Sequence, residues 1–140
     1  MFAVIMSYLS NKSDILCASA QLLHDNCYYP AVAHCAYYSC YQLLKHIWLT
    51  TMHKTEDELD VNCSQTRLGS HEYLLNEVAK YIKGLQNKDS NNDFRILCKN
   101  IPQLKRIRVN ADYKNAEFGS DESGRVITMS NETIRILKKY

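Results

Sequence analysis

Glycine and proline are scarce in this chain of 140 residues, which contains four glycines and two prolines. A β-rich domain of this length needs many tight turns, and such turns depend on these two residues. The scarcity therefore excludes a many-turned β protein and predicts an all-α fold with polar connections. The length predicts one domain with a core of its own, in keeping with an apolar content of 46%.

Long apolar runs and a strong excess of one charge are missing as well. No apolar run approaches the roughly 18 residues needed to span a bilayer, so we predict that the protein does not enter a membrane. The formal net charge of +2 is too small to indicate nucleic-acid binding by itself. A basic surface must come from local clustering, and Lys105 lies in such a cluster.

The opening residues 1–6 are apolar, but they are too short for a secretion signal and lack its basic flank. We therefore predict a cytoplasmic protein whose six cysteines stay reduced. Cys35 and Cys40 are five positions apart on one predicted helix, so their sulfur atoms cannot meet without unwinding it. We predict no disulfide bonds.

Four residues of the kind that bind zinc lie close together in the sequence: His24, Cys27, His34 and Cys35. Their spacing matches neither paired CxxC motifs nor a CxxC motif followed by HxxxH. Helix packing explains most of these positions. The sequence therefore predicts no metal site and no cofactor.

The segment from Tyr28 to Thr50 is the one around which we expect the chain to fold. Pro30 suits a first helical turn, and no glycine or proline follows until Gly69, so a helix can extend to about Trp48. Because its apolar arc is too wide for one neighbour, we predict a central helix packed on two sides. The arc comprises Ala33, Ala36, Tyr37, Cys40, Tyr41, Leu43, Leu44, Ile47 and Trp48.

His34 lies on the polar arc of this helix, and the aromatic residue Tyr38 lies there as well. Two interpretations of Tyr38 stay open. Its ring can cover a neighbouring helix while its hydroxyl stays in water. Alternatively, Tyr38 and His34 mark a groove or a dimer surface.

Apolar residues at helical spacing predict four further helices, so the expected fold is an antiparallel up-and-down bundle of four to five helices. Ser13 is the expected N-cap of the first helix, which makes residues 1–12 a lead that can be disordered and residues 13–140 one domain. The acidic run in residues 56–60 is interpreted as a solvated loop. The four helices are expected at about residues 13–25, 70–84, 92–113 and 121–140.

The helix predicted at residues 92–113 has a single apolar seam in steps of three and four, and an arginine occupies one seam position. Pro102 lies inside this helix and removes one backbone donor. We expect the helix to kink there or to restart with Asn100 or Ile101 as its cap. The seam consists of Phe94, Leu97, Ile101, Leu104, Arg108 and Ala111.

Arg108 carries most of the functional argument. It lies four positions before Asp112 on the same helix face, where the two can form an intrahelical ion pair. A guanidinium on an apolar seam is costly unless it is paired or lines a wet cleft, and its planar fork matches phosphate. Lys105 and Arg106 are close by, and Tyr113 can stack on a base. The two interpretations, structural pairing and nucleotide or RNA binding, both stay open.

The run AVAHCAYYSCYQLL in the central helix, His71 near the start of the next helix, and the later run RVNADY resemble the HEPN domain family. The chain is more narrowly similar to the bacterial and archaeal branch whose late motif reads R, two residues, then ADY. The resemblance spans about residues 13–139. The positions that match the late motif are Arg108, Ala111, Asp112 and Tyr113.

This resemblance implies a helical up-and-down bundle that forms a homodimer, with the late motifs of both copies facing a shared cleft. Many members of the family are RNA-cleaving toxins or defence proteins, often paired with a small nucleotidyltransferase. Their ribonuclease motif is an arginine followed a few residues later by a histidine. No histidine follows His71 in this chain. RNA cleavage would therefore lack its usual general acid or base, which contributes roughly 10²- to 10⁴-fold.

Three functional hypotheses result. The first is a HEPN-like dimer that binds nucleotide or RNA, as half of a toxin–antitoxin or defence pair. The second is a noncatalytic module that docks a nucleotidyltransferase through the aromatic face around Tyr38. The third is a metal-independent ribonuclease in which Asp112, or His34 or His71 from a second protomer, replaces the missing histidine. The candidate catalytic residues are Arg108 and Asp112, and the candidate binding residues are Arg108, Tyr113, Lys105, Arg106, His34, Tyr38 and His71.

Overall fold

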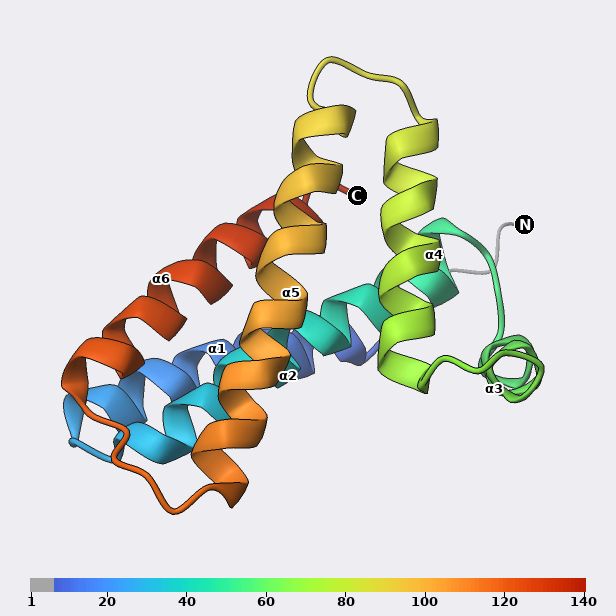
Figure 1. The fold of residues 1–140 in the computed structure, drawn as a ribbon. Helices are drawn as coiled ribbons and strands as arrows, with labels where there is room; N and C mark the ends of the chain where they lie inside the picture. The colour runs from blue at the N-terminus through green and yellow to red at the C-terminus, as the bar shows by residue number, and fades with distance from the viewer. Residues whose placement is uncertain (1–6) are drawn as a thin grey trace.

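The computed structural model describes residues 7–140, and within this range the chain is helical and contains no strand (Figure 1). The all-α prediction is confirmed. Six α-helices and one short π-helical segment follow one another in the described chain. They are α1 (Leu9–Asp25), α2 (Tyr29–His46), η1 (Ile47–Thr51), α3 (Glu56–Ser64), α4 (Ser70–Gly84), α5 (Ser90–Tyr113) and α6 (Ser120–Leu137).

Helix α2 is the central element, as its wide apolar arc predicts. It begins with Pro30 in its first turn, where the missing N–H of proline costs no hydrogen bond. It packs against α1, α5 and α6, and it also touches α4. The π-helical segment η1 prolongs it, and Trp48 in this segment is buried and donates a hydrogen bond from Nε1 to the Thr55 carbonyl (2.8 Å).

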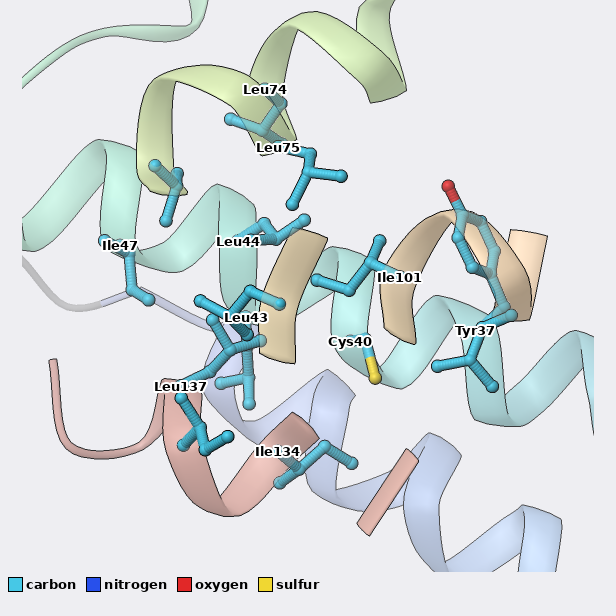
Figure 2. Close-up of a cluster of buried hydrophobic side chains, with 14 of the residues drawn as sticks. Tyr37, Cys40, Leu43, Leu44, Ile47, Leu74, Leu75, Ile101, Ile134 and Leu137 are labelled. Carbon is cyan, nitrogen blue, oxygen red and sulfur yellow. The ribbon is translucent and has the colours of Figure 1, made fainter. Parts of the chain in front are cut away.

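The core is one cluster of aliphatic and aromatic side chains drawn mainly from α2, η1, α4, α5 and α6, with one residue each from α1 and α3 (Figure 2). The middle of the seam predicted for α5 lies in it, because Leu97, Ile101 and Leu104 are buried, whereas Phe94, Arg108 and Ala111 are partly exposed. Burying one such side chain completely stabilises the fold by about 1.5–3 kcal/mol. Tyr37 lies at one end of the cluster and connects the core to the polar site described below.

The first helix begins earlier than predicted. It starts at Leu9, and Ser13 is not its N-cap. The Ser13 side chain is buried and donates a hydrogen bond to the Ser39 carbonyl of α2 (2.7 Å), so it serves helix packing rather than capping. The predicted lead of residues 1–12 is therefore wrong where it overlaps α1, and its residues 1–6 lie outside the described residues.

The acidic run is helical, so the predicted loop at residues 56–60 is wrong. Thr55 is the N-cap of α3, and its side-chain oxygen accepts a hydrogen bond from the backbone N–H of Glu58 (3.0 Å). Three acidic residues occupy the first turn, where the positive end of the helix dipole favours them. Leu59 anchors this short helix by its burial. The acidic run is thus a helix-start signal.

Helix α5 passes through Pro102 without restarting, which corrects the predicted break at Asn100 or Ile101. It also begins at Ser90, slightly before the expected cap at Asn91 or Asn92. The helix tolerates the proline because Pro102 lies on its exposed side, away from the buried seam. Helices α4 and α5 run side by side and are joined by a short connection at one end (Figure 1).

Two further findings concern the described residues 7–140 as a whole. None of their helices combines the length and the apolar character required to cross a membrane. All six cysteines are free thiols, and burial raises the pKa of the Cys40 thiol to about 12.

Candidate functional site

Arg108 is largely buried at the seam position that follows Leu104 on α5. Its side chain is 11% exposed. The guanidinium carbon lies 5.6 Å from the ring centre of Tyr37 and 5.4 Å from that of Tyr38, so two aromatic faces of α2 replace water around the charge. Aromatic contact of this kind explains how an arginine can occupy an apolar seam.

The ion pair between Arg108 and Asp112 is present but long. Arg108 Nη1 lies 3.5 Å from Asp112 Oδ2, and the same carboxylate oxygen lies 3.4 Å from His34 Nδ1. The buried Nε of Arg108 has no hydrogen-bond partner among residues 7–140. Pairing with Asp112 therefore satisfies only part of the guanidinium.

His71 lies in the first turn of α4 and reaches across to α2. Its Nδ1 lies 2.6 Å from the Tyr37 hydroxyl, and its ring stacks on Tyr41 with 4.2 Å between ring centres. Burial, followed by the positive charges of Lys105 and Arg108, lowers the pKa of His71 below its ordinary value. The imidazole is therefore neutral at pH 7.

Tyr37 stays protonated beside it, because burial raises the pKa of its phenol. A neutral imidazole and a protonated phenol share one short hydrogen bond through Nδ1. The other ring nitrogen of His71, Nε2, has no hydrogen bond to the part of the chain that the structure describes, and His71 lines a pocket. A neutral imidazole with one free nitrogen can bind a ligand or exchange a proton with it.

That pocket lies between α4 and α5 and has a volume of about 480 Å³. Aliphatic side chains and a proline form much of its wall, namely Leu75, Ile101, Pro102 and Val109. Lys105 and Arg106 of α5 contribute two positive charges to the lining. This combination of apolar walls with a few polar groups is typical of sites that bind small ligands.

The predicted site residues fall into two adjoining groups. Lys105, Arg106 and His71 line the pocket, whereas His34, Tyr38, Arg108 and Asp112 form the aromatic and charged cluster beside it. Tyr113 joins neither group and is 76% exposed. The half-buried Tyr38 ring lies among those of His34, Tyr37, Tyr41 and His71.

Sequence reasoning missed several members of the site. Tyr37 and Tyr41 were assigned to the core arc of α2, although both contact His71. Cys98 and Asn76 line the pocket without belonging to any motif, and Asn110 lines it from one of the two unspecified positions of the RVNADY run. Only contacts between separate helices bring these residues together, and such contacts leave no local sequence signal.

The chain was compared with protein-family models, with curated proteins and with solved structures, and no match was found in any of the three comparisons. The described residues also contain no group of three or more His, Cys, Asp or Glu side chains placed to hold a metal ion. The geometry of the pocket and of the cluster beside it therefore carries the functional argument.

Proposed function

We propose that this protein binds a nucleotide or RNA in the pocket between α4 and α5, with Lys105 and Arg106 meeting the phosphate. One observation carries the proposal. Two cationic side chains line a largely apolar pocket of about 480 Å³ that is also lined by the neutral imidazole of His71. An apolar wall suits a base, and cations suit the phosphate attached to it.

Arg108 contributes to this site without lining the pocket. It lies close enough to His71 to lower the pKa of that side chain. A partly buried charge is screened less by salt than an exposed one, so Arg108 adds to the attraction for phosphate. The direct phosphate contact is thus assigned to Lys105 and Arg106, with Arg108 in a positioning and electrostatic role.

The resemblance of the sequence to the HEPN family extends this proposal to the partners of the protein. We infer a HEPN-like bundle that forms a homodimer in the cytoplasm and belongs to a toxin–antitoxin or defence pair with a small nucleotidyltransferase. What supports it is the all-helical fold together with the RVNADY run at the end of α5. The noncatalytic alternative uses the aromatic face around Tyr38 as the docking surface for that partner.

Metal-independent RNA cleavage is the second candidate function, and the position of His71 favours it. The neutral imidazole lies in the same protomer as Arg108 and next to it, so no histidine from a second protomer is needed. A neutral imidazole can act as a general base near pH 7. Asp112 is not assigned the role of general base, because it contacts Arg108 and His34 and does not line the pocket.

Binding of a fluorescent single-stranded RNA and of nucleoside monophosphates tests the proposal. The double variant Lys105→Ala/Arg106→Ala should weaken binding at least about tenfold. It should also reduce the slope of log K against log salt for RNA by about 1.4, the value for two phosphate contacts on a single strand. Equal binding by the wild type and this variant would show that the pocket is not the site.

Arg95→Ala/Lys99→Ala is the matched control, because it removes two exposed charges from the same helix outside the pocket. We expect it to bind nearly as the wild type does. Arg108→Ala and Arg108→Lys separate charge from geometry, and we expect both to weaken binding because lysine lacks the planar group held by the tyrosines. RNA from each titration is then analysed for cleavage in the presence of a chelator, and His71→Phe should abolish any cleavage.

A further inference from the structure

Pro102 is an unusual residue for the middle of a helix, and it lines the pocket. An α-helix joins each N–H to the carbonyl four residues earlier, so residue 102 would normally donate to the carbonyl of Cys98. Proline has no N–H, and the Cys98 carbonyl loses this donor. Cys98 lines the same pocket. The proline therefore leaves a backbone acceptor without its usual partner at the wall of the site.

The direction of this carbonyl follows from helix geometry. Helical carbonyl groups point along the axis toward the C-terminal end, so the oxygen of Cys98 is directed toward Pro102 and toward the half of α5 that carries Lys105. Leu75 and Ile101 line the pocket as well, and their side chains offer no donor. A ligand that places an N–H group there would satisfy an acceptor that the helix itself leaves open.

The rest of the molecule gives no packing reason for this proline. Pro102 is exposed, so its ring fills no space in the core. The only other proline of the chain, Pro30, stands at the start of α2, where the missing N–H is harmless. Pro102, in contrast, lies where proline weakens a helix, and the residue whose carbonyl loses its donor, Cys98, lines the pocket.

We propose that the pocket selects a nucleotide unit whose base carries an exocyclic amino group, with the amine donating to the Cys98 carbonyl and the phosphate meeting Lys105 and Arg106. This inference rests on the proposed function. Cys98 and Lys105 are seven positions apart, which corresponds to on the order of 10 Å along the helix. That separation is comparable to the length of one nucleoside monophosphate from its amino group to its phosphate.

The remaining polar groups of the pocket are compatible with this orientation. The carboxylate of Glu72 lies on the α4 side, where it repels phosphate and can accept hydrogen bonds from sugar hydroxyls. The cations lie on the α5 side. The phosphate is therefore directed to the α5 wall, the same wall that carries the free carbonyl.

Two pairs of mononucleotides test the proposal, because each pair differs mainly in the exocyclic group. CMP and AMP carry an amine where UMP and IMP carry a carbonyl, which would face the Cys98 carbonyl with a second acceptor. By calorimetric titration we expect the wild type to bind CMP over UMP, and AMP over IMP, by about tenfold. Short oligonucleotides of cytidine and of uridine, titrated in parallel, show whether a free nucleotide or a unit of RNA is preferred.

Pro102→Ala is the decisive variant. It restores an N–H that donates to the Cys98 carbonyl, so the helix should become more resistant to heat while the preference for CMP over UMP disappears. The affinity for all ligands can fall with the lost ring, and the readout is therefore the ratio of the two dissociation constants. Pro30→Ala is the matched control, and it should keep the preference.

The outcomes separate this inference from the proposed function. Equal binding of CMP and UMP by the wild type would overturn the selectivity for an amine and leave phosphate binding intact. A preference that survives in Pro102→Ala would overturn the role of the Cys98 carbonyl. If no nucleotide and no oligonucleotide binds, both proposals are wrong.

Discussion

Arg108 shows how a single charged residue can occupy an apolar seam. The faces of Tyr37 and Tyr38 lie against its guanidinium, and Asp112 pairs with one of its nitrogens. Stacking of this kind suits arginine better than lysine, because the guanidinium is planar and weakly hydrated. Its charge then acts on His71, which links the seam of α5 to the wall of the pocket.

The lowered pKa of His71 predicts a pH-dependent stability. The folded protein holds His71 with a pKa below that of the unfolded chain, so the unfolded chain binds more protons as the pH falls. The stability is therefore complete above the ordinary histidine value of about 6.5 and is lost as the pH falls toward the folded pKa. Urea unfolding at a series of pH values between 7 and 5 should show that the free energy of unfolding falls as the pH falls.

His71→Phe isolates this contribution, because the ring still stacks on Tyr41 but no longer titrates. The decrease between pH 7 and pH 5 should be smaller in the variant than in the wild type. Burial also lowers the pKa of His46, which gives the same sign and remains in both proteins as a common background. Identical slopes in the two proteins would contradict the assignment of His71 as a neutral, half-buried imidazole.

At the scale of elements, the N-cap at the start of α3 gives a local test. Thr55→Ala removes the acceptor of the Glu58 N–H and should cost about 1 kcal/mol of helix stability. Because α3 packs mainly against α4, and meets α2 through the ion pair between Glu56 and Lys45 (3.0 Å), the effect should be local. Hydrogen exchange should show faster exchange of the α3 amides with little change in α2.

Thr66→Ala is the matched control for this prediction. Thr66 lies beyond the C-terminal end of α3, and its hydroxyl donates a hydrogen bond to the Cys63 carbonyl in the last turn of α3 (3.2 Å). The change is chemically the same, but it removes no N-cap. We expect a smaller effect on α3 amides, and a larger effect than that of Thr55→Ala would argue against the capping role of Thr55.

How well the elements could be predicted depended on whether their signal was local. The apolar arc of α2 and the seam of α5 are local patterns, and the arc and the middle of the seam lie in the core as expected. Helix α3 was missed because its acidic first turn also resembles a solvated loop, and only the bond from Glu58 to Thr55 distinguishes the two. Ser13 has the side chain of an N-cap, but its actual partner belongs to α2.

For the site as well, local sequence signals were predictable and contacts between helices were not. Lys105 and Arg106 stand out as neighbouring cations in the sequence, and both line the pocket. The bond between His71 and Tyr37 joins α4 to α2, so no spacing within either helix could reveal it. Tyr113 was selected as a stacking residue from its motif, yet it lies exposed at the end of α5 and outside the pocket.

At the scale of the whole molecule, α2 positions the site by contacting the helices that form it. It supplies Tyr37 and Tyr38, while α4 supplies His71 and α5 supplies the cations. Because these helices share one core, a loss of packing between them would move all three groups at once. Stability and binding are therefore expected to be coupled in variants of the core.

The end of the chain ties several of these elements together around Asp93. This carboxylate is 2% exposed and lies in the first turn of α5. It accepts a hydrogen bond from the Tyr140 hydroxyl and forms an ion pair with Lys139 Nζ (2.8 Å), and both of these residues follow α6. The Tyr140 carbonyl in turn accepts a hydrogen bond from the Thr51 hydroxyl of η1 (3.2 Å). The group thus connects α5, α6 and η1.

Tyr140→Phe should destabilise the whole molecule, because it removes the hydrogen-bond donor of a buried carboxylate and leaves it with the Lys139 ion pair. A hydrogen bond to a charged group contributes about 1.5–3 kcal/mol, so the free energy of unfolding should fall by roughly this amount. Chemical denaturation followed by both fluorescence and circular dichroism should give one shifted transition.

Tyr113→Phe is the matched control, because Tyr113 is 76% exposed and its substitution should change the stability little. A double variant with Asp93→Asn should lose less than the sum of the two single changes, because the residues contact each other. Additive effects, or a Tyr140→Phe variant as stable as the wild type, would show that the contact does not hold the helices together.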